Sequence, residues 1–264
     1  MKRIQVLVAL LAVTAAAPAR PDPLTSDCLV AASATAEIGA AAEGVLSAIR
    51  VERGDRVAAG DVLVALEAGA EESRAALARI RAGDDTAIRI AEARAEEART
   101  RLERARSLVA RGLAEAERAE SAALDLATAE LEREAALRAR QIARGERAAA
   151  EADLARRIVR APFDGVVVAR TMELGEHYDR SESILTLART DPLHVEAFLP
   201  LARAAALAPG QDVVVELETG GRHPAVIDVI DPVADAATGT LGIRATLPNP
   251  DAALVAGQTC RLFD

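Results

Sequence analysis

The residue types that most often carry catalysis are few and scattered in this chain of 264 residues. Its three histidines, His177, His194 and His223, show no spacing typical of metal ligands, and surface or loop positions explain each of them better. No nucleophile-elbow, phosphate-loop or dinucleotide-binding pattern is present in the sequence. Most acidic residues fall on helical faces, where pairing with an arginine four positions away is the ordinary explanation. We therefore predict a protein that is not an enzyme and that has no metal site.

Two cysteines, Cys28 and Cys260, are the remaining candidates for covalent chemistry. Two basic residues precede the apolar run 4–17, and a small-x-small pattern ends at Ala19. Residues 1–19 are therefore predicted to be a signal peptide that is cleaved after Ala19, and an uncleaved membrane anchor is the alternative. Either way the chain is exported, and an oxidising compartment favours a disulfide between the two cysteines. Two buried free thiols are the alternative.

The composition restricts the partners and the shape of the protein. A net charge of -9 argues against nucleic acid or an anionic lipid surface as a partner, because both require a basic face. Aromatic residues make up 2% of the chain and there is no tryptophan. Since large compact cores usually draw on aromatic area, we expect an elongated protein with thin cores.

A β-like pattern occurs twice, in residues 37–70 and again in residues 158–190. Both segments contain short apolar runs broken by glycines, which is typical of strands joined by tight turns. Neither half can bury its apolar face alone, so we expect the two segments to form one small β-sandwich. Two glycines recur at an offset of 121 positions, Gly44 as Gly165 and Gly54 as Gly175, and all four are expected at the turns of the sandwich.

Residues 71–157, between the two copies, are rich in Ala, Arg, Glu and Leu, which are strong helix formers. Gly112 divides this stretch into two helical arms, and an antiparallel hairpin with its tip near 109–116 is predicted in preference to one continuous helix. Gly83-Asp84-Asp85 marks a break in the first arm. The first arm is expected to pack through Ile88, Ala91, Ala95, Ala98, Leu102, Ala105 and Val109. The second is expected to pack through Leu124, Thr128, Leu131, Ala135, Arg138, Ile142, Gly145, Ala149 and Ala152.

Residues 191–264 contain strand-like runs separated by turn residues, such as the alternation of Val213, Val215 and Leu217. They predict a small antiparallel barrel of five or six strands, with a short helix at 201–207. Residues 20–36 are treated as an N-terminal segment. The predicted fold class is mixed α and β: a coiled-coil hairpin inserted between two halves of a β-sandwich, followed by a β-barrel.

This order of elements resembles the periplasmic adaptor subunits of tripartite efflux pumps, also called membrane fusion proteins, of the HlyD type. The resemblance covers essentially the whole mature chain. It is most specific in "APFDGVVVARTMELGE", "TDPLHVEAFLP", "APGQDVVVEL" and "VIDPVADAATGTLGIRATLPNP". It implies that the bipartite sandwich is lipoyl-like, and that the protein exports small molecules without catalysing a reaction. It also implies a periplasmic location at the inner membrane.

The resemblance implies three kinds of partner. The barrel would meet an inner-membrane transporter, most often of the RND type, the hairpin tip would meet an outer-membrane channel protein, and copies of the chain would form a homo-oligomeric ring. A membrane-proximal domain is expected to be absent or minimal. The family tip carries an Arg, a Leu four residues later and a Ser beyond the turn, and Ala114 takes the Ser position here. The residues expected at the channel contact are Arg104, Leu108, Arg111, Gly112 and Leu113.

Three other functions compete with this assignment. A carrier of biotin or lipoate needs a lysine at its turn, but the only lysine is Lys2, inside the signal peptide, so no cofactor is expected. An adaptor of an ABC-type or metal exporter is the second. A structural coiled-coil envelope protein without a transport role is the third.

Overall fold

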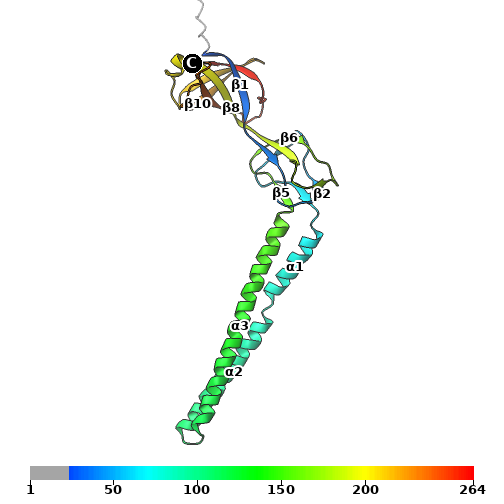
Figure 1. Cartoon of the computed structure of the whole chain (residues 1–264), viewed down its shortest axis with the longest axis vertical. Coiled ribbons are helices and arrows are strands. Elements are labelled where there is room, and N and C mark those ends of the chain that lie inside the picture. Colours follow the sequence, from blue (N-terminus) through cyan, green and yellow to red (C-terminus); the bar gives the residue numbers. More distant parts are fainter. Residues whose placement is uncertain (1–23) are drawn as a thin grey trace, which may run out of the picture. The chain divides into compact units, whose positions relative to one another are not determined.

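A computed structural model describes residues 24–264, and the predicted signal peptide lies outside them. The described residues divide into two units, which we call the hairpin unit (residues 36–187) and the barrel unit (residues 24–35 and 188–264). The fold class is mixed α and β with a closed antiparallel barrel, as the sequence predicts (Figure 1). None of the helices within residues 24–264 has the length and apolar character needed to cross a membrane.

The barrel unit is one sheet that closes on itself. Its strand order is β1-β12-β9-β10-β11-β8, and β1 also pairs with β8. Apolar side chains alternate inward, as in β11, where Leu241, Ile243, Ala245 and Leu247 are buried. A short helix, α4 (Leu201–Ala204), follows β8. The strands are β1 (Thr25–Ile38), β8 (Leu185–Pro200), β9 (Asp212–Leu217), β10 (Arg222–Ile230), β11 (Thr240–Leu247) and β12 (Thr259–Phe263).

Strand β1 was not expected in the barrel, since the sequence assigns the barrel to residues 191–264 alone. The structure places β1 beside β12, with Cys28 and Val30 in the barrel core. The segment that follows, "AASATAE", is mostly small residues with low strand propensity, so its sequence pattern does not predict a strand. Pairing with β12 and β8 makes it one.

The β-part of the hairpin unit is built from both copies of the repeated pattern. One sheet has the order β5-β4-β2-β7, and β3 pairs with β6 at the end of the other sheet, next to β8. Every one of these pairings except β2–β4 joins the first copy to the second. The strands are β2 (Gly44–Ile49), β3 (Arg56–Val57), β4 (Val62–Leu66), β5 (Ile158–Arg160), β6 (Gly165–Arg170) and β7 (His177–Tyr178).

The two copies pair reciprocally, as an internal repeat should. The Gly54 amide donates to the Val167 carbonyl at 2.8 Å. At the equivalent positions of the other copy, the Gly175 amide donates to the Leu46 carbonyl at 2.9 Å. The core draws on both copies, for example Leu46, Leu63 and Leu66 from the first with Val167, Tyr178 and Ile184 from the second. The apolar side chains of each copy are therefore buried against those of the other, and this burial stabilises both.

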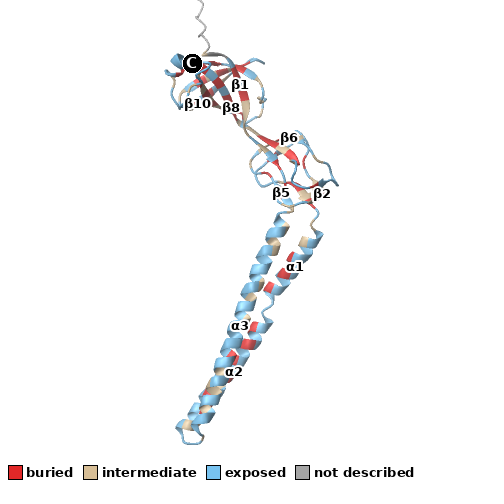
Figure 2. Cartoon of the chain, viewed as in Figure 1, coloured by how far each residue is buried: buried red, intermediate tan, exposed pale blue. Residues whose placement is uncertain are grey.

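Three helices form the hairpin: α1 (Gly69–Gly83), α2 (Thr86–Ala110) and α3 (Ala116–Ala155). Helix α3, with 40 residues, packs against α1 and α2 in turn and is roughly 60 Å long at about 1.5 Å per residue. The break at Gly83-Asp84-Asp85 is present, and the Thr86 amide donates to Asp84 Oδ1 at 2.9 Å. The buried residues of α2 are those expected from the sequence: Ile88, Ala91, Ala95, Ala98, Leu102 and Ala105 (Figure 2).

The packing face predicted for α3 is wrong. Leu124, Leu131 and Ile142 are 69%, 63% and 64% exposed, and the buried residue of α3 is Ala129. The real inward face is lined mainly by alanines that recur every seven positions, with a few longer side chains between them. Its members that are buried or half-buried are Ala122, Leu126, Ala129, Ala136, Arg140, Ala143, Ala150 and Leu154. Alanine on both helices allows close approach, so the larger apolar residues are left on the outside.

Candidate functional site

The tip of the hairpin is a tight turn between α2 and α3, residues 111–115. The Leu113 amide donates to the Leu108 carbonyl and the Gly112 amide donates to the Val109 carbonyl, both at 2.9 Å. This pair of bonds is the Schellman motif that ends many helices, and it requires a left-handed residue after the cap. Gly112, with φ of +70°, meets that requirement. Its position in the sequence therefore fixes where the chain reverses.

A groove of about 780 Å³ lies at this tip between α2 and α3. Three of the five predicted tip residues, Arg104, Leu108 and Leu113, line it. Leu113 is 68% exposed and Leu108 is half-buried, so the groove has an apolar floor that solvent can reach. Arg111 lies outside it, where its Nε donates to the Ser107 carbonyl at 3.2 Å. The structure thus brings the predicted residues to one end of the hairpin.

The groove carries both signs of charge around its apolar centre. Arg101, Arg104 and Arg118 contribute cations, while Glu115, Glu117 and Asp125 contribute carboxylates. The Arg104 guanidinium makes neither a hydrogen bond nor an ion pair within residues 24–264, so it is available to an external acceptor. A mixed polar rim around exposed leucines is typical of a protein contact surface.

Sequence reasoning missed the α3 side of this groove. Ser121 and Asp125 line it together with Leu108 and Arg104. The sequence comparison had placed the tip serine at Ala114, which also lines the groove but has no hydroxyl. Counting outward from Gly112 along both arms would have found these residues, because antiparallel helices bring positions equally distant from the turn together.

Arg157 joins the base of the hairpin to the β-part. Its Nη1 donates to the Glu43 carbonyl at 2.8 Å, and its Nη2 donates to Glu71 Oε1 at 3.0 Å. A backbone hydrogen bond at Glu71, reinforced by the Arg157 charge, holds the pKa of the Glu71 carboxyl below its ordinary value of 4.5, although partial burial opposes this shift. A Cβ on Gly44 would lie 2.7 Å from Arg157 Nη1, so a larger residue there would displace the guanidinium.

Only two of the four predicted turn glycines are in turns. Gly54 and Gly175 adopt φ of +97° and +88°, where glycine is favoured. Gly44 and Gly165 instead begin strands β2 and β6. Gly44 pairs with Tyr178, and at the equivalent position Gly165 pairs with Val57. The glycine spacing identified the repeat, but it did not distinguish strand starts from turns.

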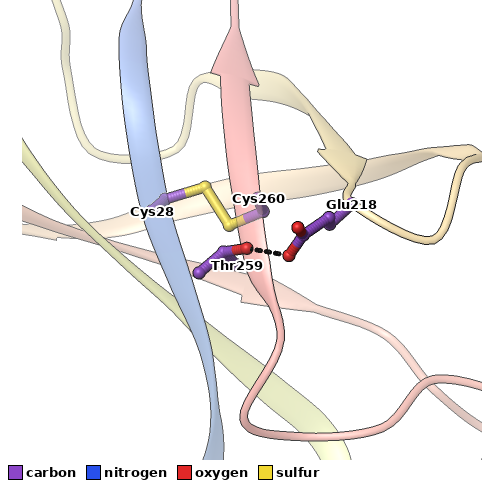
Figure 3. Close-up of a disulfide and its surroundings, with 4 residues drawn as sticks. All are labelled: Cys28, Glu218, Thr259 and Cys260. Atoms are coloured by element: carbon purple, nitrogen blue, oxygen red, sulfur yellow. Dashed lines mark hydrogen bonds between the residues drawn. A yellow bond between two sulfur atoms is a disulfide. The ribbon is translucent and has the colours of Figure 1, made fainter.

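Cys28 and Cys260 face each other across β1 and β12 and form a disulfide (Figure 3). Both are buried, at 5% and 4% exposure. Beside them, the Thr259 hydroxyl donates to the Glu218 carboxylate. The disulfide ties the first strand of the barrel to the last.

The three histidines lie on different strands: His177 opposite Val45, His194 opposite Thr246 and His223 opposite Val215. Within residues 24–264, no group of three or more His, Cys, Asp or Glu side chains is arranged to hold a metal ion.

Comparison with known proteins defines the class of the barrel unit first. Residues 192–262, from β8 to β12, match the family described as "CusB-like, beta-barrel domain". A crystal structure of MacA from Actinobacillus actinomycetemcomitans has the same fold, with a TM-score of 0.74 and 18% identity over 89% of this chain and 76% of that one. At this identity the likeness concerns the fold alone.

Two curated relatives extend the match beyond the barrel. The chain is 33% identical over 256 residues to the pyoverdine export membrane fusion protein PvdR of Pseudomonas putida, which covers 86% of this chain. It is 32% identical over 213 residues to the nodulation protein NolF of Rhizobium meliloti, which covers 79% of this chain. The matches span 65% and 54% of those relatives' own lengths. The chain is therefore a relative of membrane fusion proteins, as its sequence predicts.

Proposed function

We propose that this protein is a non-catalytic periplasmic adaptor that links an inner-membrane efflux transporter, of the RND type, to an outer-membrane channel protein. The observation that carries the proposal is the combination of a long hairpin inserted into a bipartite β-domain with a CusB-like barrel in the same chain. The bipartite domain is lipoyl-like in this proposal, and its role is to hold the hairpin. The cargo that this adaptor helps to export is a small molecule.

The hairpin tip is the proposed contact with the channel protein. The groove there combines exposed Leu113, the available guanidinium of Arg104 and the carboxylates on α3. Leucine supplies apolar contact area, and the charged rim selects the orientation of the partner. Because the contact area of a single tip is small, the channel protein is bound stably only when the tips of several copies bind it together.

The outer face of α3 is the proposed contact between copies in a homo-oligomeric ring. Leu124, Leu131 and Ile142 form a line of exposed apolar side chains along this helix. On the opposite arm, Ile80 and Ile90 are 71% and 50% exposed. An apolar edge on each arm allows the α3 edge of one copy to meet the α1 and α2 edge of the next, which is a heterologous contact that closes into a ring.

The location follows from the predicted signal peptide, which would deliver the chain to the periplasm. There the barrel unit is proposed to meet the inner-membrane transporter, so that the protein is membrane-associated through its partners. The disulfide between Cys28 and Cys260 suits this oxidising compartment.

Affinity purification from cells tests the tip assignment. We expect Leu108→Asp and Leu113→Asp to abolish recovery of the channel protein, because each places a carboxylate in the apolar floor of the groove. Leu174→Asp is the matched control, since it adds the same charge to a similarly exposed leucine of the β-part, which belongs neither to the tip nor to the proposed contact between copies. Unchanged recovery with both tip variants would remove the assignment, provided circular dichroism shows the helices intact.

A further inference from the structure

Helix α3 contains three arginines at a strict seven-residue spacing, Arg133, Arg140 and Arg147, and of these Arg140 is half-buried while the other two are exposed. Arg133 forms an ion pair with Glu92 of α2 at 3.5 Å. Arg147 shares Glu151 with Arg79 of α1, at 3.1 Å and 2.7 Å. Two of the three arginine positions therefore have partners that also bridge the two arms of the hairpin.

Arg140, the middle one, has no such partner. Its Nε is buried and makes no hydrogen bond, and its guanidinium forms no ion pair with the described residues. A buried donor without an acceptor is rare in folded proteins because it loses its hydrogen bonds to water and gains nothing in return. This arginine needs an explanation that the other two do not.

Arg140 lies level with the break between α1 and α2. The ion pairs of Arg79 with Glu151 and of Glu92 with Arg133 lie on either side of it, which places the break and the first turn of α2 opposite Arg140. Asp85 is in this break, and its carboxylate makes no hydrogen bond or ion pair in the described part of the chain. An unpaired cation and an unpaired anion thus occupy facing segments at the same height.

The spacing of the first arm shows that Asp85 occupies an inward-facing position in the heptad pattern. Buried Ala75, Ala78 and Ala82 of α1 are followed by buried Ile88 of α2. Asp85 is three residues from both Ala82 and Ile88, a step that keeps side chains on one helical face. It is nevertheless exposed, because the chain leaves the helical conformation at Asp84, with ψ of 117°.

We infer that the break between α1 and α2 is a joint with two positions, open and closed, and that Arg140 is the residue that binds Asp85 in the closed position. In the open position, seen here, Asp85 points to solvent and Arg140 is unpaired. In the closed position the Asp85 carboxylate turns inward and forms an ion pair with the Arg140 guanidinium, as Glu92 does with Arg133. The joint lets the first arm bend against a continuous α3, and it does not depend on the adaptor function.

Hydrogen exchange of the backbone amides of residues 84–88, measured on the full chain, tests the joint. Arg140→Gln and Asp85→Asn each remove the closed position, so each is expected to accelerate exchange there by about threefold or more. The double variant is expected to exchange no faster than either single variant, because both changes remove the same pair. The exchanged pair Asp85→Arg with Arg140→Asp is expected to restore the wild-type rate.

Arg144→Gln is the matched control, because it removes an exposed arginine of α3 one turn further along and is expected to leave the rate unchanged. The joint is rejected if neither single variant changes exchange at 84–88, or if their effects multiply in the double variant. It is also rejected if the exchanged pair fails to restore the rate while circular dichroism shows native helix content.

Discussion

Arg157 Nη2 donates to Glu71 Oε1 at 3.0 Å and so connects the end of α3 to the start of α1. Both side chains are largely shielded, with 21% and 12% of their side-chain area exposed. The same guanidinium reaches the Glu43 carbonyl in the β-part. Three segments that are distant in the sequence therefore meet at the base of the hairpin, and one arginine holds them together.

The Glu71 contact predicts a dependence of stability on pH. The pKa of Glu71 is lower in the folded protein than its ordinary value of 4.5, so its contribution is fully present above that value and is lost as the pH falls through the lower one. Glu71→Gln should flatten this part of the acid unfolding curve. Comparison of thermal midpoints between pH 6 and about pH 3 checks this, and an unchanged pH dependence in Glu71→Gln would contradict it.

Gly39 and Tyr178 predict a clash that can be repaired. A Cβ on Gly39 would collide with the hydroxyl of the buried Tyr178. We expect Gly39→Ala to lower the free energy of unfolding by about 1–3 kcal/mol, as overpacking does, and Tyr178→Phe in the same chain to recover most of the loss. Chemical denaturation measures both.

Gly145 provides the control for that experiment, since it lies inside α3 and a Cβ added there would meet no other atom within 4 Å. Gly145→Ala is expected to stabilise the hairpin by about 1 kcal/mol through helix propensity. If Tyr178→Phe fails to rescue Gly39→Ala, the proposed contact is not the cause of the loss.

The disulfide predicts a large stability difference in the barrel unit. Replacing both cysteines, Cys28→Ser with Cys260→Ser, should lower the free energy of unfolding by about 2–5 kcal/mol, because the unfolded chain then gains the freedom of a long open loop. A reductant should lower the unfolding midpoint of the wild-type protein to about that of the double variant, and it should leave the midpoint of the double variant unchanged. Two thiols that can be alkylated in unreduced protein from the periplasm would show that the link is not formed there.

The sequence predicted the packing of α2 but not that of α3, and the reason is chemical. In α2 the apolar residues and the inward positions coincide, from Ile88 to Ala105. In α3 the line of large apolar residues formed by Leu124, Leu131 and Ile142 faces solvent. Mostly alanines line the inside, and such a face carries almost no hydrophobic periodicity for a pattern to detect.

The remaining differences have similar causes. The barrel assignment omitted β1, because its small residues become a strand only through the pairing of β1 with β12 and β8. The α2 residues of the tip groove could be predicted from one arm of the hairpin. Ser121 and Asp125 come from the other arm, and predicting them requires counting outward from Gly112 along both helices.

Cross-linking in living cells, followed by purification of the tagged full-length chain and mass spectrometry, tests the adaptor function most directly. If the protein is an adaptor, both an inner-membrane transporter and an outer-membrane channel protein are recovered. Cross-links to the channel should be confined to the tip region, residues 104–118, and cross-links to the transporter should be found on the barrel unit. Recovery of neither membrane protein, or channel cross-links on the barrel unit instead of the tip, would contradict the account.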